Sequence, residues 1–156
     1  MRYLGCHLSA SEGYLAMVRT AENIDANTFA FFTRNPRGSR AKQEDPVDAA
    51  AACKALAEKI FGKLVAHGAY TMNLCTGEPE ARASAASILE DDLRRMAALP
   101  GNYYNFHPGS HVGQGADAGI QQISDALKQA LRHNYTVTVL LETMAGKGSE
   151  MGGKFG

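Results

Sequence analysis

The sequence has no tryptophan, only three cysteines, and no excess of charge of either sign. Cys6, Cys53 and Cys75 are odd in number and share no CxxC spacing, which argues against a disulfide scaffold and a cysteine-built zinc site. No apolar run approaches the roughly 20 residues that cross a bilayer, and the first ten residues do not resemble a signal peptide. We therefore expect a cytoplasmic protein with no membrane partner.

The net charge of the chain does not indicate whether it binds nucleic acid. Sixteen basic residues match sixteen acidic ones, so the overall charge gives no electrostatic indication of nucleic-acid binding. A local basic patch remains compatible with this neutral average. With 156 residues, of which 45% are apolar, the composition predicts one ordinary domain over residues 1–156.

What the sequence does contain is a regular alternation of short apolar runs and longer helical patterns. The predicted strands are residues 2–8, 28–33, 63–68, 103–109 and 136–143, and the predicted helices between them are 12–24, 46–62, 78–99 and 117–134. Such alternation predicts parallel strands joined by right-handed crossovers. The strands are almost continuously apolar, as expected for a sheet covered on both faces.

The spacing of the strands favours an α/β fold of the TIM-barrel type. The polar residues that end the predicted strands are His7, Thr33, His67, His107 and Glu142. They follow one another at about 34 residues on average, so eight units would fill about 270 residues, the usual size of a (β/α)8 barrel. The chain would then hold about the first five βα units. An open doubly wound sheet is the alternative, although no GxGxxG motif follows the first strand.

Histidine and glutamate recur at these strand ends. Because the carboxyl ends of parallel strands meet on one face, we expect His67, His107 and Glu142 to converge. Two imidazoles and a carboxylate suit Zn²⁺, with Mn²⁺ or Fe²⁺ as weaker alternatives, and the second carboxylate oxygen could reach another metal. Taken singly, each could be an ordinary polar residue at a strand end. His7 and His111 are weaker candidates, for which hydrogen bonds to the ligands and a direct catalytic role are both open.

A basic segment follows the second predicted strand. The sequence RNPRGSR places Arg34, Arg37 and Arg40 on a loop at the same edge of the sheet, and Tyr70 lies three residues after His67. The loop could simply be a solvated basic surface. Arginine and an aromatic beside a metal site are also the composition expected of a surface that binds and distorts a phosphodiester backbone.

Five segments together resemble the endonuclease IV family of apurinic/apyrimidinic endonucleases: YLGCHLSASEG, FFTRNPRGSR, HGAYTMNLC, NFHPGSHVGQG and LLETMAGKGSEMG. The resemblance covers the whole chain in order. It implies a (β/α)8 barrel that holds three zinc ions and cleaves DNA 5′ to an abasic site. It further implies that His67 and His107 bind one zinc, that Glu142 bridges two zincs at the catalytic centre, and that Arg37 and Tyr70 probe the DNA minor groove.

The chain also departs from the family pattern. Ser39 stands where family members often have tryptophan, and Thr71 where they often have a larger apolar residue. The zinc ligands that the family carries on its sixth to eighth strands have no counterpart here. We therefore expect the N-terminal portion of a longer protein, truncated after the fifth strand, with at most about one full zinc site.

The sequence thus predicts a DNA-repair endonuclease that hydrolyses the phosphodiester 5′ to abasic sites by means of metal-activated water. Its partner would be double-stranded DNA with abasic sites, and the full-length protein would be a monomer. One alternative is a metal-dependent sugar isomerase or epimerase on a similar barrel, although a neutral sugar does not need three arginines. The other is a non-catalytic remnant that lacks the full metal cluster.

Overall fold

Five parallel strands form a single sheet in a computed structural model that describes residues 2–153. The strands are β1 (His7–Leu8), β2 (Ala30–Phe32), β3 (Val65–His67), β4 (Tyr103–Phe106) and β5 (Thr138–Leu141). Their spatial order is the order of the sequence, β1-β2-β3-β4-β5. A doubly wound sheet reverses its strand order at a switch point, whereas a barrel adds each strand beside the last. The sheet therefore has the topology of a TIM-type barrel.

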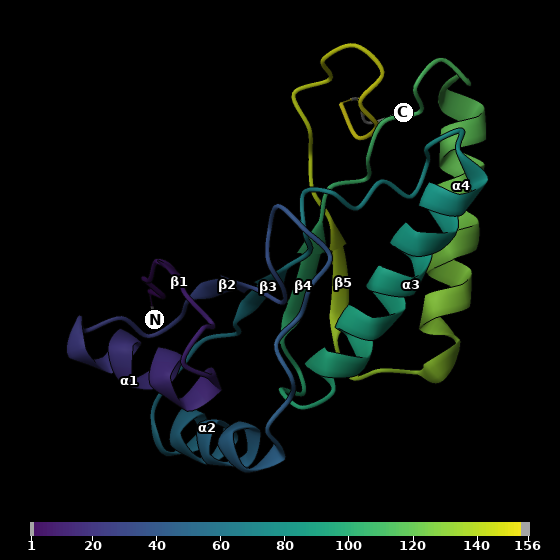
Figure 1. Cartoon of the computed structure of the whole chain (residues 1–156). Coiled ribbons are helices and arrows are strands. Elements are labelled where there is room, and N and C mark those ends of the chain that lie inside the picture. Colours follow the sequence, from purple (N-terminus) through teal and green to yellow (C-terminus); the bar gives the residue numbers. More distant parts are fainter. Residues whose placement is uncertain (1, 154–156) are drawn as a thin grey trace.

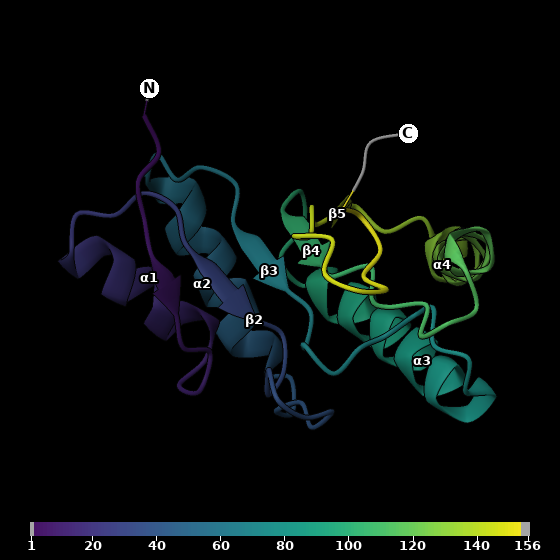
Figure 2. The same ribbon diagram turned by 90° about the horizontal axis from the view of Figure 1, so that it is seen from above.

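Four helices connect the strands. They are α1 (Tyr14–Asn23), α2 (Pro46–Glu58), α3 (Pro79–Met96) and α4 (Ala116–Ala130), and the 3₁₀ turn η1 (Leu131–His133) follows α4. In Figure 1, α1 and α2 lie beside the β1–β3 part of the sheet, and α3 and α4 lie beside β4 and β5. The view from above in Figure 2 shows the same two pairs of neighbouring helices. Among the described residues no helix is long and apolar enough to cross a membrane.

The observed elements are shorter than the predicted ones, chiefly at their ends. The first strand was predicted over residues 2–8, but β1 begins only at His7, so this histidine starts the strand instead of ending it. Residues 4 and 27 exchange hydrogen bonds beside it, with Asn27 supplying both its main chain and its side chain. The prediction for the fourth strand was also too long, because β4 ends at Phe106 and His107 begins the following turn.

Helix ends follow from local chemistry in two cases and from tertiary contact in a third. Pro46 and Pro79 occupy the first turn of α2 and α3, where no main-chain donor is needed. Asp45 caps α2 by accepting from the main chain of the next turn. For α1 the cap comes from α2: the carboxylate of Asp48 accepts from the main-chain N–H of Tyr14 at 2.5 Å and of Leu15 at 3.2 Å.

The core lies between the sheet and the helices. On the helix side of the strands, Phe31, Ala66, Tyr104 and Phe106 are fully buried. Because side chains alternate along a strand, the intervening residues point to the opposite face of the sheet. His67 belongs to this second set and is only half-buried. The packing of the helices therefore sets which strand residues remain available for chemistry.

Candidate metal centre

The register of the sheet brings the predicted metal ligands to one face. His67 on β3 pairs with Asn105 on β4, which in turn pairs with Leu140 on β5. His107 lies two residues beyond Asn105, and Glu142 lies two residues beyond Leu140. The period of two along a strand therefore puts all five side chains on the same face, with His107 and Glu142 at the carboxyl edge.

The three predicted ligands meet at this edge. One ligand atom from each of His67, His107 and Glu142 lies within 4.8 Å of the other two. His67 Nε2 is 2.9 Å from Glu142 Oε2, and His107 Nε2 is 3.6 Å from Glu142 Oε1. Ligand atoms around a tetrahedral zinc ion are about 3.3 Å apart, given bonds of about 2.0 Å. The two separations, each to a different Glu142 oxygen, lie on either side of this distance. The donor types fit a zinc ion, and the three residues lie close enough together to surround one.

Hydrogen bonds fix the orientation of the ligands. His67 Nδ1 is 2.7 Å from the carbonyl oxygen of Gly68, and because a carbonyl can only accept, Nδ1 carries a proton. The other ring nitrogen, Nε2, is thereby directed toward Glu142, as is usual for a metal-binding histidine. Asn105 donates from its side-chain nitrogen to Glu142 Oε2. Sequence reasoning missed Asn105, and the only signal for it was its position two residues before His107.

The environment of Glu142 favours the ionised carboxylate. Burial raises the pKa of Glu142, but hydrogen bonds from His67 and Asn105 lower it by more, and the nearby charge of His107 adds to the lowering. The net result is a pKa below the ordinary value for glutamate. An ionised carboxylate is the form that binds a metal ion. When His67 Nε2 binds the metal it no longer donates to Glu142, and the hydrogen bond from Asn105 is the one that can continue to favour the ionised form.

The turn after β4 is held from the neighbouring loop. Gly109 has φ of +102°, a conformation that other residues rarely adopt, and an added Cβ would collide with the side-chain oxygen of Asn73. This oxygen accepts from the main-chain N–H of Ser110 at 3.1 Å, while the Asn73 amide donates to the Ser110 carbonyl at 2.9 Å. Asn73, which sequence reasoning also missed, thus fixes the segment that carries His107.

Tyr70 and Arg37, the two predicted DNA contacts, lie on adjacent loops. The Tyr70 side chain is 55% exposed, and its ring centroid is 5.7 Å from that of His67 and 5.3 Å from that of His107. Its main-chain N–H donates to the carbonyl of Pro36, the residue before the exposed Arg37. The structure therefore places the aromatic residue directly beside the predicted ligands and joins it to the arginine-bearing loop.

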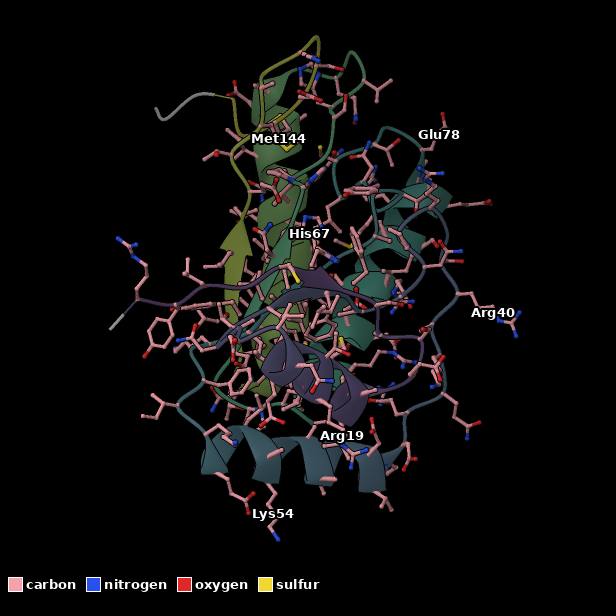
Figure 3. All side chains as sticks on the ribbon, turned by 90° about the vertical axis from the view of Figure 1, so that its left-hand side faces the viewer. Arg19, Arg40, Lys54, His67, Glu78 and Met144 are labelled. Carbon is pink, nitrogen blue, oxygen red and sulfur yellow. The ribbon has the colours of Figure 1, made fainter. Side chains whose placement is uncertain are left out.

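The other two arginines of this loop do not lie as the sequence suggested. Arg34 was expected on a loop that is either solvated or phosphate-binding, but its side chain is buried and paired with Asp91 and Asp92, so this expectation is wrong for Arg34. Both carboxylate partners lie on α3, in the helix layer. Arg40 is exposed and projects outward, away from His67 (Figure 3). Of the three, Arg37 directly follows Pro36, whose carbonyl accepts from the main-chain N–H of Tyr70.

His7 and His111 make contacts other than hydrogen bonds to the three ligands. The ring of His7 packs on Phe32, with centroids 4.6 Å apart, and Phe32 in turn contacts His67. Burial and the neighbouring His67 lower the pKa of His7 below its ordinary value. The Nδ1 atom of His111 accepts from the main-chain N–H of Gly115 before α4. The support that these two histidines were expected to give the ligands stays a prediction.

The sequence of the chain matches the model of a known protein family. Residues 18–156 match the family model described as "Xylose isomerase-like TIM barrel". The chain belongs to the xylose isomerase-like TIM barrel family. This confirms the TIM-type fold that the strand spacing predicted and excludes the doubly wound alternative. Within residues 2–153 the structure shows five of the strands of such a barrel, with four connecting helices.

Relatives within the family are nucleases by name. The probable endonuclease 4 of Akkermansia muciniphila is 52% identical over 155 residues, which cover 99% of this chain and 56% of that protein. The crystal structure of endonuclease IV from Thermus thermophilus matches with a TM-score of 0.78 at 31% identity, over 97% of this chain and 55% of its own. The resemblance to the endonuclease IV family is therefore confirmed. The chain spans about half the length of these relatives.

A more distant likeness concerns the fold alone. D-psicose 3-epimerase with D-tagatose, from Clostridium cellulolyticum H10, matches with a TM-score of 0.63 at 10% identity, over 90% of this chain and 53% of its own. At this identity the match shows that nucleases and sugar epimerases share the barrel. The residues at the carboxyl edge, and not the fold, must separate the two activities.

Proposed function

We propose that the protein is a zinc-dependent endonuclease that hydrolyses the phosphodiester 5′ to abasic sites in double-stranded DNA. The observation that carries this proposal is the convergence of His67, His107 and Glu142 at one edge of the sheet. The relatives named endonuclease 4 support the reaction class. The chain covers only about half of these relatives, so the activity is proposed for the complete protein.

The three residues would hold zinc with different roles. His67 and His107 each offer Nε2, while Glu142 directs one oxygen toward each imidazole. A carboxylate in this position can share its oxygens between two ions, which is the role proposed for Glu142 as the catalytic carboxylate. When bound, zinc supplies positive charge that polarises a phosphoryl oxygen and lowers the pKa of water. Three ions are proposed for the complete protein and at most about one full site for this chain.

The neighbouring surface would recognise the damaged duplex. The exposed face of Tyr70 offers an aromatic surface for stacking against a base or an unpaired sugar. Arg37 provides a planar cation on the adjacent loop, suited to phosphate or to a narrow minor groove. Abasic DNA favours such a site because less stacking energy opposes the extrusion of a nucleotide that has lost its base.

Metal binding provides the first test. Zinc content of the purified chain should approach one ion per molecule and should fall sharply in His67→Ala and in His107→Ala. His133→Ala is the matched control, because His133 contacts Glu90 on the surface of the helix layer. Equal zinc content in His67→Ala and His133→Ala would contradict the assignment.

Activity provides the second test. The complete protein should incise a labelled duplex 5′ to a single abasic site and leave an intact duplex uncut. His67→Ala should abolish most of this incision. Turnover of a ketose without incision of DNA would instead indicate the epimerase alternative. Zinc-free protein without incision would indicate a non-catalytic remnant.

A further inference from the structure

Two charged side chains lie in the interior of the described part of the chain. Arg34 is 8% exposed and Asp92 is fully buried. Removing an ion pair from water costs free energy, and apolar residues of similar size often stabilise a protein as well or better. The burial of this pair is therefore weak evidence for a gain in stability over apolar residues, whereas its geometry indicates a positioning role.

The Arg34 guanidinium joins three parts of the fold. Its Nε and Nη2 atoms donate to Asp92 Oδ1 on α3 at 2.9 Å and 2.6 Å. The other Asp92 oxygen accepts from the hydroxyl of Tyr104 on β4 at 2.7 Å. The remaining nitrogen of Arg34, Nη1, donates to the main-chain carbonyl of Ser39 at 2.7 Å. The ion pair is thus anchored in the core on one side and holds a surface loop on the other.

The loop in question is residues 34–40, here termed the arginine loop. Asn35 N donates to the Arg40 carbonyl at 3.1 Å, so this bond and the Arg34–Ser39 bond close the loop at its base. Arg37 lies at the tip, where its main-chain N–H donates to the Asn35 side chain. Pro36 accepts from the main-chain N–H of Tyr70 at 2.9 Å, which attaches the tip to the loop that follows β3.

Only arginine can satisfy this arrangement. The guanidinium is a rigid plane with five donors, so one edge can bind a carboxylate while another nitrogen reaches a carbonyl across the loop. A lysine nitrogen is a single point and cannot span both sites. Burial lowers the pKa of Arg34, but its bonds to Asp92 and Asp91 raise it by more, so the side chain remains charged.

We propose that Arg34, bound to Asp92, is a positioning residue that fixes the arginine loop. It thereby holds the main chain that carries Arg37 against the loop of Tyr70, whose ring contacts His67 and His107. This inference rests on the proposed function in one respect, that Arg37 and Tyr70 would contact DNA. The buried pair limits the freedom of the loop before the duplex arrives. Ordering the contact residues in advance removes a cost that binding would otherwise have to meet.

The absence of tryptophan allows a direct test of loop order. Ser39→Trp introduces a sole tryptophan at an exposed position of the arginine loop whose main-chain carbonyl is the acceptor for Arg34. In this background, time-resolved fluorescence anisotropy should show that Arg34→Lys increases the amplitude of fast local motion by about twofold. Tyr104→Phe, which removes one hydrogen bond to Asp92 and preserves the charges, should give a smaller increase.

Arg82→Lys is the matched control. Arg82 lies on α3, the helix that carries Asp92, and it also donates to a main-chain carbonyl, that of Thr76 at 2.6 Å, but outside the arginine loop. The change should leave the fast motion of the loop unaltered. Unchanged loop motion in both Arg34→Lys and Tyr104→Phe, measured well below the melting temperature, would overturn the positioning role.

Binding to an abasic-site duplex separates this proposal from the proposed function. If Arg34→Lys leaves the loop ordered about a tenth of the time, the affinity should fall about tenfold. In an Arg37→Ala background the same change should have no further effect, because Arg34 acts through Arg37. An equal loss in both backgrounds would contradict the coupling. Failure of the complete, unaltered protein to bind the duplex would count against the proposed function, whereas the anisotropy result would still test the loop.

Discussion

Glu142 lies between two imidazoles and receives a hydrogen bond from the side chain of Asn105. Because this bond orients the carboxylate and favours its ionised form, Asn105→Ala should lower zinc affinity by about 10- to 100-fold. Competition with a coloured chelator measures this directly. Asn102→Ala is the control, since Asn102 bonds the main chain at the opposite end of β4. Equal affinities in the two variants would show that Asn105 does not support the site.

Asp91 makes the stability of the fold depend on pH in the acidic range. Burial raises its pKa, but hydrogen bonds from Arg95, Arg94 and Arg34 lower it by more, so the folded-state pKa lies below the ordinary value. A depressed carboxyl pKa stabilises the fold above the unfolded-state value of about 4, and this stabilisation is lost as the pH falls through the folded-state pKa.

Asp91→Asn should therefore destabilise the protein by about 1 kcal/mol near neutral pH. The melting temperatures of the variant and the unaltered protein should approach each other below about pH 4, because Asp91 of the unfolded chain then becomes protonated. Asp125→Asn, on the exposed surface of α4, serves as the comparison. A difference that stays constant from pH 7 to pH 3 would contradict the role given to the three arginines.

The arginine loop shows that residue type alone does not determine whether a side chain is buried, paired or exposed. Arg34, Arg37 and Arg40 occur within seven residues and are equivalent in the sequence pattern. In the structure Arg34 is buried, Arg37 is exposed and follows the residue that bonds the Tyr70 main chain, and Arg40 projects outward. The difference arises from Asp92, 58 residues away from Arg34, and no local pattern announces that partner.

At the level of elements, the positions of the helices can be predicted from the sequence, whereas the groups that cap them cannot always be. The main-chain N–H groups at the start of α1 are satisfied by Asp48, which belongs to α2. Gly13 precedes α1 with φ of +107°, and an added Cβ would lie 2.6 Å from an Asp48 oxygen. The two helices therefore depend on each other at this point.

Asp48→Ala should destabilise the fold by about 1 kcal/mol, because it leaves two helix N–H groups without their acceptor. Asp48→Asn retains one side-chain oxygen and should cost less. Urea unfolding monitored by circular dichroism measures both. Identical midpoints for the alanine variant and the unaltered protein would show that water replaces the carboxylate without loss.

For the whole molecule, the two ends of the sheet matter most. Within residues 2–153, β1 pairs only with β2 and β5 pairs only with β4. Tyr3, Leu4 and Leu141, at or near these edges, are at least half exposed. Unpaired strand edges with apolar side chains favour association with other chains. We therefore expect the 156-residue chain by itself to be poorly soluble or oligomeric.

Size-exclusion chromatography with light scattering tests this expectation. Oligomers or aggregates at micromolar concentration are the expected result, and Leu141→Lys should reduce them because charge at an edge opposes strand pairing. Ile120→Lys is the control, since Ile120 is similarly exposed but lies on α4. A monodisperse monomer with a sharp thermal transition would show that the open edges are tolerated.

The sequence by itself determined the class of fold and the grouping of the candidate metal ligands. Apolar runs separated by helical segments prescribe parallel strands, and parallel strands direct their carboxyl ends to one edge, so His67, His107 and Glu142 could be grouped from the chain alone. The tertiary structure alone decided the partners that hold these residues. Asn105, Asn73 and Asp92 act through register and through contacts between distant segments, which depend on how helices and strands pack and leave no periodic trace in the chain.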